Sequence, residues 1–451
     1  MLSNDIFLNI FRHCLDASPW YWPTLAHVCH RWRQVIFRSP VGLGLRLYCT
    51  YGTPVLRNLD FWPALPIVVQ YGGFPTPDPP SSAPDDDNNI LAALKHPDRV
   101  FSIGLTITSS LLSKLFAINQ PFSNLEEMVL MSPDNVHLTL PGNLQWGTRL
   151  RSLHSTRIAI PALPQLLSSS KHLVDLQLHE VPSIGYFSPQ AFANALNGMT
   201  QLQSLSLHFL SPTSCHSLVG VSPFSEERVV LPALFDFKFR GTSDYLNTLV
   251  TRIDTPRLAD IQVRFFHQLI FDLSQLARFI NRIDAQRSHR RVDVVSSERS
   301  ISICFTQPGA SNIRLGLQVS CEQLDWQLAS ITQFCDQFSP FLHRIEDLGF
   351  YTTRHSSERD DVDGEQWLDL IRAFGDTKDF RVAGGLATKV LGALRPDHGE
   401  HTTVFPSLRT LGVPELGEMR GQLWEAVQSF IAPYEHSGRV VKIYQVTVLA
   451  P

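Results

Sequence analysis

Some residues of this chain have the types that bind metals. The run from Asp360 to Glu365 is rich in carboxylates and contains Gly364, as a calcium-binding loop does. With Gly364 as the sixth position of such a loop, Arg359 would stand first and Leu370 twelfth, so neither end carries a ligand. We therefore interpret this run as a solvated acidic loop and expect no metal there.

The pairs His13-Cys14 and Cys29-His30 have the residue types of a zinc site. Adjacent helical residues point about 100° apart, however, and both cysteines fall on expected apolar helix faces, so we interpret them as core thiols. The chain lacks the motifs GxxxxGK[ST], GxGxxG, GxSxG and HExxH. We expect no catalytic residue, no cofactor and no enzymatic activity.

The composition limits the partners and the compartment. The formal net charge is -4, which argues against nucleic acid as the main partner. The cluster Arg287, His289, Arg290 and Arg291 is interpreted as a solvated loop. Seven dispersed cysteines without a CxxC spacing indicate reduced thiols. With no signal peptide and no apolar run of membrane-spanning length, we expect a soluble cytoplasmic and/or nuclear protein without membrane contact.

Residues 1–40 have the pattern of a small helical module. Ile6, Phe7, Ile10, Phe11 and Cys14 recur at helical spacing, after the candidate N-caps Asn4 and Asp5 and before a stop at 16–19. A second helix is expected from Pro23 to before Pro40, with its apolar face on the following residues: Leu25, Val28, Cys29, Trp32 and Ile36. The aromatic residues of this module exceed what two short helices bury, so they either dock to a partner or pack on the rest of the chain.

Two linking segments follow the module. Residues 41–73 form a connector with edge strands expected at 43–51 and 65–71. Residues 74–89 are rich in proline and aspartate, so we expect a flexible loop. The domain at 90–451 comes after them.

Leucine repeats dominate the rest of the chain. Copies of LxxLxL, some degenerate, start at residues 125, 150, 173, 202, 234 and 258, and later ones near 345 and 408. The starts of the first six copies are 23 to 32 residues apart, a range that overlaps the leucine-rich-repeat period of about 20–29 residues. Helices are expected between copies at 189–196 and 244–252, and later ones through Leu324–Phe338 and Leu423–Ile431. The expected fold is α/β, with an irregular leucine-rich-repeat solenoid and a parallel sheet, whose register between about 270 and 340 is unassigned.

Within each repeat strand the leucines point inward and the residues between them face outward. The outward residues are mostly polar and include Asp175, Gln177 and Lys238. Further along the strands, a basic ridge is expected that would receive an acidic or phosphorylated segment of a target: His179, His208, Arg240 and Arg264. Charged strand ends without a binding role are the alternative.

The N-terminal zone resembles the F-box family, whose pattern runs from Leu-Pro through an acid and an apolar helix to Val-Cys-x-x-Trp. The matching residues are Leu2, Asp5, Ile6, Ile10, Phe11, Leu15, Leu25, Val28, Cys29 and Trp32. The segment 13–40 is similar to F-box proteins of mushroom-forming fungi, which often carry degenerate leucine-rich repeats. Ser3 stands where the family usually has proline. With almost no residues before Leu2, a reduced N-terminal edge of the contact is expected.

This resemblance implies a substrate-receptor subunit of a Skp–cullin–F-box ubiquitin ligase. The Skp-type adaptor, and through it a cullin, would bind the ten residues Leu2, Ile6, Ile10, Phe11, Leu15, Leu25, Val28, Cys29, Trp32 and Ile36. The repeats would bind a protein target for ubiquitin-dependent degradation. The alternative is a ligase-independent leucine-rich-repeat scaffold for protein–protein interaction.

Overall fold

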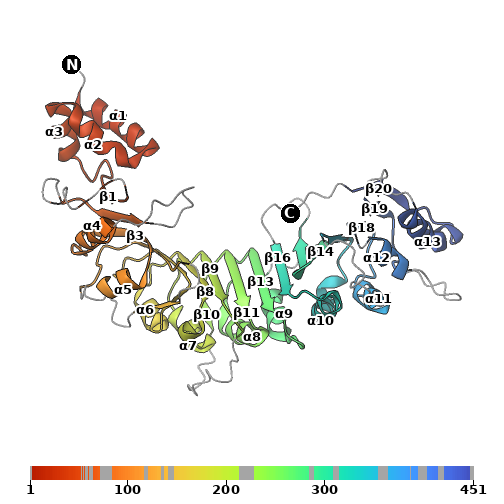
Figure 1. The fold of residues 1–451 in the computed structure, drawn as a ribbon. Coiled ribbons are helices and arrows are strands. Elements are labelled where there is room, and N and C mark those ends of the chain that lie inside the picture. The colour runs from red at the N-terminus through yellow and green to blue at the C-terminus, as the bar shows by residue number, and fades with distance from the viewer. Residues whose placement is uncertain are drawn as a thin grey trace. The chain divides into compact units, whose positions relative to one another are not determined.

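The structure is a computed structural model that divides into two compact units. It describes residues 3–446 except 52, 54, 56–58, 60–63, 72–83, 116–119, 134–136, 141–146, 213–227, 284–288, 308–313, 354–363, 386, 395–403 and 415–420. Unit 1 contains Met1–Phe187 and Asn194–Ser204, and unit 2 contains Ser188–Ala193 and Leu205–Pro451. Each unit is treated by itself below (Figure 1).

Unit 1 begins with a helical module made of α1 (Asn4–Ala17), a 3-10 turn (Pro19–Tyr21), α2 (Trp22–Val28) and α3 (His30–Arg38). The N-cap of α1 is Ser3, whose hydroxyl accepts from the Ile6 amide, and not the expected Asn4 or Asp5. The single helix expected from Pro23 to Pro40 is broken at Cys29, where the backbone is extended at φ -159° and ψ 166°. The Cys29 thiol caps α3 instead, accepting from the Trp32 amide at 3.4 Å.

The sheet of unit 1 is parallel, and its strands follow the order of the chain. They are β1 (Leu47–Cys49), β2 (Ile67–Tyr71), β3 (Val100–Thr106), β4 (Glu127–Met131), β6 (Ser152–Thr156) and β8 (Asp175–Val181). Helices α4 (Pro84–Leu94), α5 (Ser109–Leu115) and α6 (Leu163–Ser169) lie between them in the chain. A small parallel pair, β5 (Leu138–Thr139) with β7 (Ile158–Ala159), and the 3-10 turn Ser183–Gly185 complete the unit.

The first linking segment contains its expected strands, and the second differs from its prediction. β1 pairs with β2 and β2 pairs with β3, so the strands expected at 43–51 and 65–71 are present and form the edge of the sheet. The expected flexible loop at 74–89 overlaps helix α4, which begins at Pro84, while residues 74–83 lie outside the described part. Asn89 is buried in this helix and its side-chain oxygen accepts from the Val55 amide at 2.7 Å. Although this segment is polar, Asn89 can be buried because the Val55 amide gives its side chain a hydrogen-bond partner.

Unit 2 has a sheet in the order β9-β11-β13-β16-β15-β14-β17-β18-β19-β20. The strands are β9 (Ser204–Phe209), β11 (Asp236–Gly241), β13 (Asp260–Phe266), β14 (Arg291–Ser297), β15 (Ser300–Thr306), β16 (Arg314–Ser320), β17 (Asp347–Thr352), β18 (Asp379–Ala383), β19 (Thr410–Val413) and β20 (Lys442–Gln445). A small parallel pair joins β10 (Val229–Val230) to β12 (Ile253–Asp254).

Helices cover one side of this sheet (Figure 1). They are α8 (Ser243–Arg252), α9 (Ser274–Asn281), α10 (Leu324–Leu342), α11 (Gly364–Arg372), α12 (Ala387–Ala393) and α13 (Gln422–His436), and α7 (Pro189–Ala195) precedes them in the chain. Aromatic pairs join strand to helix, among them Phe265 with Phe334 of α10 at 5.6 Å between ring centroids. The apolar core therefore lies between the sheet and the helices, and the other face of the sheet is left to polar residues.

The repeat prediction is confirmed strand by strand. Each of the eight LxxLxL copies leads into a strand that begins two residues after its first leucine or isoleucine, from β4 after Leu125 to β19 after Leu408. The helices expected at 189–196, 244–252, 324–338 and 423–431 are also present. The chain thus has an α/β fold with N-terminal helices and leucine-rich-repeat strands in long parallel arrays.

The unassigned region 270–340 contains a departure from the regular repeat. β13 pairs in parallel with β16, and β15 lies antiparallel between β16 and β14, after which β14 pairs in parallel with β17. An inserted hairpin of β14 and β15 therefore interrupts the parallel order. Arg291, expected in a solvated loop, opens β14, and His289 is buried.

Candidate functional site

An apolar patch lies on the surface of the helical module. Ile6, Ile10 and Val28 are 45%, 42% and 57% exposed, and Cys29 beside Val28 is exposed as well. α1 supplies two of these residues, and the end of α2 supplies the third. We refer to Ile6, Ile10 and Val28 as the helical patch. Three exposed apolar side chains on so small a module make it a candidate contact surface.

Other residues of the expected adaptor set lie elsewhere. Phe11, Leu15 and Ile36 are buried at 0%, 6% and 0% exposure, so they support the module from its core and present no contact surface in this structure. Leu25 and Trp32 are half-buried, and Leu2 lies outside the described residues. The amphipathic spacing placed these residues on the apolar faces of two helices, whereas the break at Cys29 lets Trp32 of α3 pack against Phe11 of α1.

The aromatic side chains of the module are better buried than expected. Phe7, Phe11 and Trp32 form one cluster, with Phe11 and Trp32 rings 5.0 Å apart. Trp22 is 1% exposed, and its indole nitrogen donates to the Arg46 carbonyl at 2.6 Å, beside the first strand. Only Trp20 and Tyr21, among the described aromatics of the module, remain above half exposed. The aromatic content therefore builds a core in large part, and the helical patch is aliphatic.

The cysteines of the module also differ from their prediction. Cys14 and Cys29 are exposed free thiols and not core residues. Within the described residues, no group of three metal-binding side chains comes together. In the same part of the chain, no helix has the length and apolar character needed to cross a bilayer. The acidic residues 360–363 lie outside the described part, and Gly364 opens α11.

The second candidate surface is the polar face of the repeat sheets. In unit 1, Asp175 and Gln177 lie on this face as expected, both half-buried. His154 contacts the Asp175 carboxylate at 2.6 Å from the neighbouring strand. Burial acts to raise the pKa of Asp175, but the hydrogen bond and charge of His154 outweigh it and hold that pKa below its usual range. His179 lies on the same face of this unit, at a position paired with Thr156.

Unit 2 places the remaining members of the expected ridge on its own polar face. Arg240 and Arg264 occupy paired positions on β11 and β13, so their side chains are direct neighbours. His208 lies half-buried on β9, the next strand beyond β11. Lys238, also expected to bind, is held by Asp236 at 3.0 Å. The sequence register thus predicted the adjacency of the two arginines correctly.

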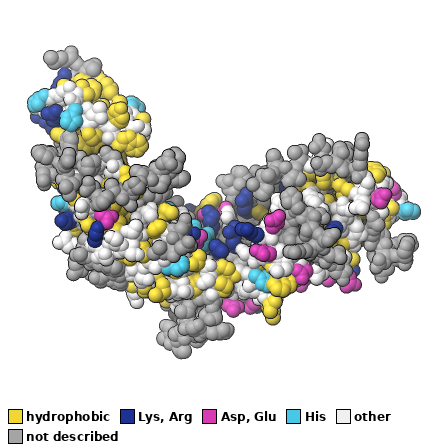
Figure 2. Space-filling model, viewed as in Figure 1, with side chains coloured by type: hydrophobic (Ala, Val, Ile, Leu, Met, Phe, Trp, Pro, Cys, Tyr) yellow, Lys and Arg dark blue, Asp and Glu magenta, His cyan; other side chains and the backbone are white. Residues whose placement is uncertain are grey.

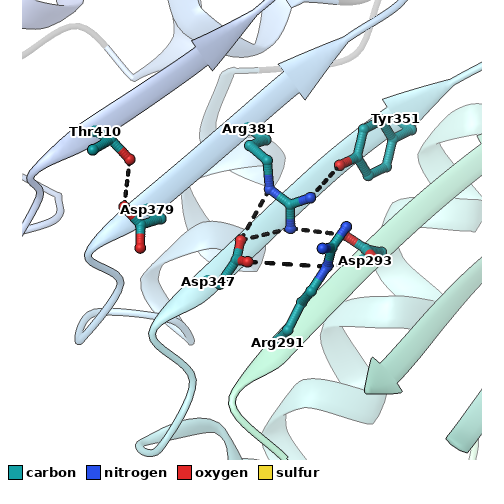
Figure 3. A network of polar contacts seen from close by, with 7 residues as sticks. All are labelled: Arg291, Asp293, Asp347, Tyr351, Asp379, Arg381 and Thr410. Atoms are coloured by element: carbon teal, nitrogen blue, oxygen red, sulfur yellow. Dashed lines mark hydrogen bonds and ion pairs between the residues drawn. The ribbon is translucent and has the colours of Figure 1, made fainter. Parts of the chain in front are cut away.

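A buried ion-pair network on the same face was missed from sequence (Figure 3). Arg381 of β18 is only 8% exposed, and its Nε and Nη2 donate to one oxygen of Asp347 at 2.9 and 2.5 Å. The same guanidinium reaches Asp293 at 3.2 Å and the Tyr351 hydroxyl at 2.8 Å. Arg291 closes the network by contacting Asp293 at 3.1 Å.

The network balances two arginines with two aspartates. Burial raises the pKa of Asp347, although the charges of Arg381 and Arg291 oppose this shift. Gly349 leaves the necessary room: a Cβ there would lie 2.3 Å from the Asp293 carboxylate oxygen and 2.6 Å from the Tyr351 ring. No local sequence pattern marked this network, because its members come from three strands that are far apart in the chain. The network is saturated by its own members, so its first role is structural.

Comparisons with known proteins found similarity to solved structures. No protein-family model and no curated protein matches the chain. Among solved structures it is similar to the leucine-rich repeat-containing protein LegL7 from Legionella pneumophila, with 11% identity, a TM-score of 0.29, and 86% of this chain and 98% of that chain covered. It is also similar to the TLR13 chain of a complex with ssRNA13, with 10% identity, a TM-score of 0.33, and 83% and 46% covered. This chain thus spans about half of that TLR13 chain.

The repeats of the chain itself define the class of the fold. Parallel strands opened by LxxLxL segments, with helices on one side and polar residues on the other, form a leucine-rich-repeat type of α/β protein. Proteins built in this way present an extended sheet face for binding. The helical module with its exposed patch is the feature that this class does not account for.

Proposed function

We propose that the chain is a substrate-receptor subunit of a Skp–cullin–F-box ubiquitin ligase. In this role the helical module binds the Skp-type adaptor, and through it a cullin, while the sheet faces bind a protein target. The observation that carries the proposal is the helical patch on a module whose own core is complete without it. The resemblance of residues 1–40 to the F-box pattern supports the same partner.

In this proposal the protein has no catalytic step of its own. Several polar residues on the sheets are held by one another, as Arg381 is by Asp347, and are therefore poorly suited to proton transfer. Cys14, Cys29, Cys304 and Cys335 carry free thiols, which supports a reducing compartment, the cytosol or the nucleus.

The test is co-purification of the full chain with the Skp-type adaptor. We expect the wild-type chain to retain the adaptor and the Ile10→Asp/Val28→Asp variant to lose it, because the variant places two carboxylates on the contact surface. Val41→Asp is the matched control, since Val41 is 92% exposed and lies outside the helical patch. Trp32 is left unchanged because it packs against Phe11 in the core. Absence of the adaptor from the wild-type preparation would refute the proposal.

A second candidate function is a ligase-independent leucine-rich-repeat scaffold. It is favoured by the contacts that tie the module to the sheet of unit 1, where Trp22 donates to Arg46 and Arg12 donates to the Gly42 carbonyl at 3.3 Å. Under this alternative, the module caps the sheet end and stabilises it. Val28→Asp would then leave partner capture by the repeats unchanged, and no adaptor would co-purify.

A further inference from the structure

Two arginines on the polar face of unit 2 lie side by side without a counter-charge. Arg240 and Arg264 are paired across β11 and β13. Neither guanidinium lies within 4.0 Å of a carboxylate oxygen of any described residue. Like charges directly opposite each other on neighbouring strands destabilise a sheet. This sheet therefore carries a cost that a bound anion would relieve.

On the side of β16 and β15, the described residues in the row of the pair supply no compensating charge. The next residues in the same row are Gln318 and Ser302, which are neutral. Arg264 donates from Nε to the Gln318 side-chain oxygen at 2.7 Å, which orients its remaining donors. The Nε of Arg240 is buried and has no hydrogen-bond partner among the described residues. Burial and the charge of Arg240 lower the pKa of Arg264.

Several other charged residues of this face are paired, in contrast to the two arginines. Arg291 and Arg381 are held by Asp293 and Asp347. Lys238, two residues before Arg240, is held by Asp236. Figure 2 shows Lys and Arg side chains gathered where the middle strands of unit 2 lie, with acidic side chains nearby.

The pair is also held in place for binding. The Arg240 guanidinium lies 5.3 Å from the centroid of the Phe266 ring, a cation–π contact that restricts its side chain. Gln318, which fixes Arg264, donates in turn to the Ser300 hydroxyl at 2.8 Å. Two positioned guanidinium groups present forked donors that match the oxygens of a phosphate group.

We propose that Arg240 and Arg264 bind a phosphoserine or phosphothreonine in the protein target. This inference rests on the proposed function, because it assumes that the sheet of unit 2 receives a protein segment. A phosphorylated side chain brings about two negative charges and three acceptor oxygens, which balance the two arginines. A nucleic-acid backbone fits less well, since Asp236 and Asp260 open the same two strands and would repel a polyanion.

The experiment uses the purified full chain and synthetic peptides. An array of peptides carries one central phosphoserine or phosphothreonine with randomised flanks, and each peptide is repeated without phosphate and with glutamate at the centre. Fluorescence anisotropy then measures binding of the best phosphopeptide to wild type, to Arg240→Gln/Arg264→Gln, and to Arg278→Gln/Arg372→Gln. The last variant is a matched control that removes two exposed arginines from helices α9 and α11 of the same unit.

We expect the sheet variant to bind the phosphopeptide at least about tenfold more weakly than wild type, and the helix variant to bind it like wild type. The peptides without phosphate and with glutamate should bind more weakly than the phosphopeptide. The proposal is wrong if no phosphopeptide in the array binds, or if its affinity depends neither on phosphate nor on the two arginines. It is equally wrong if a single-stranded RNA oligonucleotide displaces the peptide and binds more tightly.

Two further measurements distinguish a failure of this inference from a failure of the proposed ligase function. Thermal unfolding of Arg240→Gln/Arg264→Gln should match wild type or occur at a higher temperature, because the variant removes a like-charge contact. Adaptor co-purification is measured on the same preparations. Retained adaptor with absent phosphopeptide binding overturns this inference alone, whereas absent adaptor with retained phosphopeptide binding overturns the ligase role alone.

Discussion

At the scale of single residues, the polar faces show how burial and charge are matched. Arg381 is almost fully buried on a sheet face that would otherwise be solvated, and two aspartates and a tyrosine satisfy it. Removing one member of a buried pair leaves the other charge uncompensated, which usually costs more than the pair itself contributes. The network is therefore sensitive to single substitutions.

Arg381→Met should lower the free energy of unfolding by about 2 kcal/mol at neutral pH, because Asp293 and Asp347 lose their main counter-charge but keep partial access to water. The folded-state pKa of Asp347 is already raised by burial, and the substitution raises it further. A carboxyl group whose pKa is raised by folding destabilises the folded protein at pH values above its unfolded-state pKa. It has no such effect at pH values where the group is protonated in both the folded and the unfolded state. The difference in the free energy of unfolding between Arg381→Met and wild type should thus be smaller at pH 4 than at pH 7.5 in urea titrations.

Arg372→Met, at an exposed arginine of α11, is the control for this measurement. An equal loss at both pH values would contradict the account.

Thiol reactivity reports on burial at the same scale. Cys14 and Cys29 are exposed, whereas Cys49, Cys321 and Cys335 are buried. Burial also raises the pKa of the Cys304 thiol to about 11, so its reactive thiolate is scarce at neutral pH. Brief alkylation of the native protein with iodoacetamide, followed by peptide mass spectrometry, should modify Cys14 and Cys29 well before these other four. Early modification of Cys335 would show that the packing around α10 is wrong.

At the scale of elements, room between strands decides where side chains fit. Gly316 and Gly349 both occupy the polar face of unit 2, on β16 and β17. A Cβ on Gly316 would meet only the Ile261 carbonyl oxygen at 3.9 Å, whereas a Cβ on Gly349 would overlap Asp293 and Tyr351. The absence of a side chain is therefore required at Gly349, where Asp293 and Tyr351 fill the space, and is not required at Gly316.

Gly349→Ala should destabilise unit 2 by about 1–3 kcal/mol, because the added methyl group displaces Asp293 or Tyr351 from Arg381. Gly316→Ala should leave stability unchanged or raise it by about 0.5–1 kcal/mol, since it restricts the unfolded chain without a clash. Chemical denaturation of both variants measures the contrast. Equal effects of the two substitutions would argue against the packing described around the network.

At the scale of the whole molecule, periodic features were predictable and long-range ones were not. The leucines of each LxxLxL copy, such as those that start at Leu173 and Leu202, have a fixed pattern, so the strands that follow them could be located from local sequence alone. The β14–β15 hairpin was missed because its place between β16 and β17 depends on pairing that the leucine spacing does not encode. Its strict alternation, with Val292 and Val294 buried, was the usable signal.

The candidate sites were also predictable where the repeat register placed their residues and not where long-range contacts did. Adjacency of Arg240 and Arg264 followed from the repeat register, because equivalent positions in consecutive repeats pair directly. The contact of Arg381 with Asp293 joins residues 88 positions apart and had no local signature. In the helical module, the spacing found the apolar residues but not the break at Cys29, which depends on a backbone conformation. The sequence pattern therefore could not separate core from contact residues.

The central claim is that the helical patch binds a Skp-type adaptor, and hydrogen exchange of the full chain with and without the purified adaptor tests it most directly. Burial of Ile6, Ile10 and Val28 under a partner should slow exchange of backbone amides in α1, α2 and α3. Exchange in the strands of unit 2 should not change. Protection confined to residues 4–38 is the predicted result. Unchanged exchange in these helices at saturating adaptor, or protection of the sheets in their place, would contradict the account.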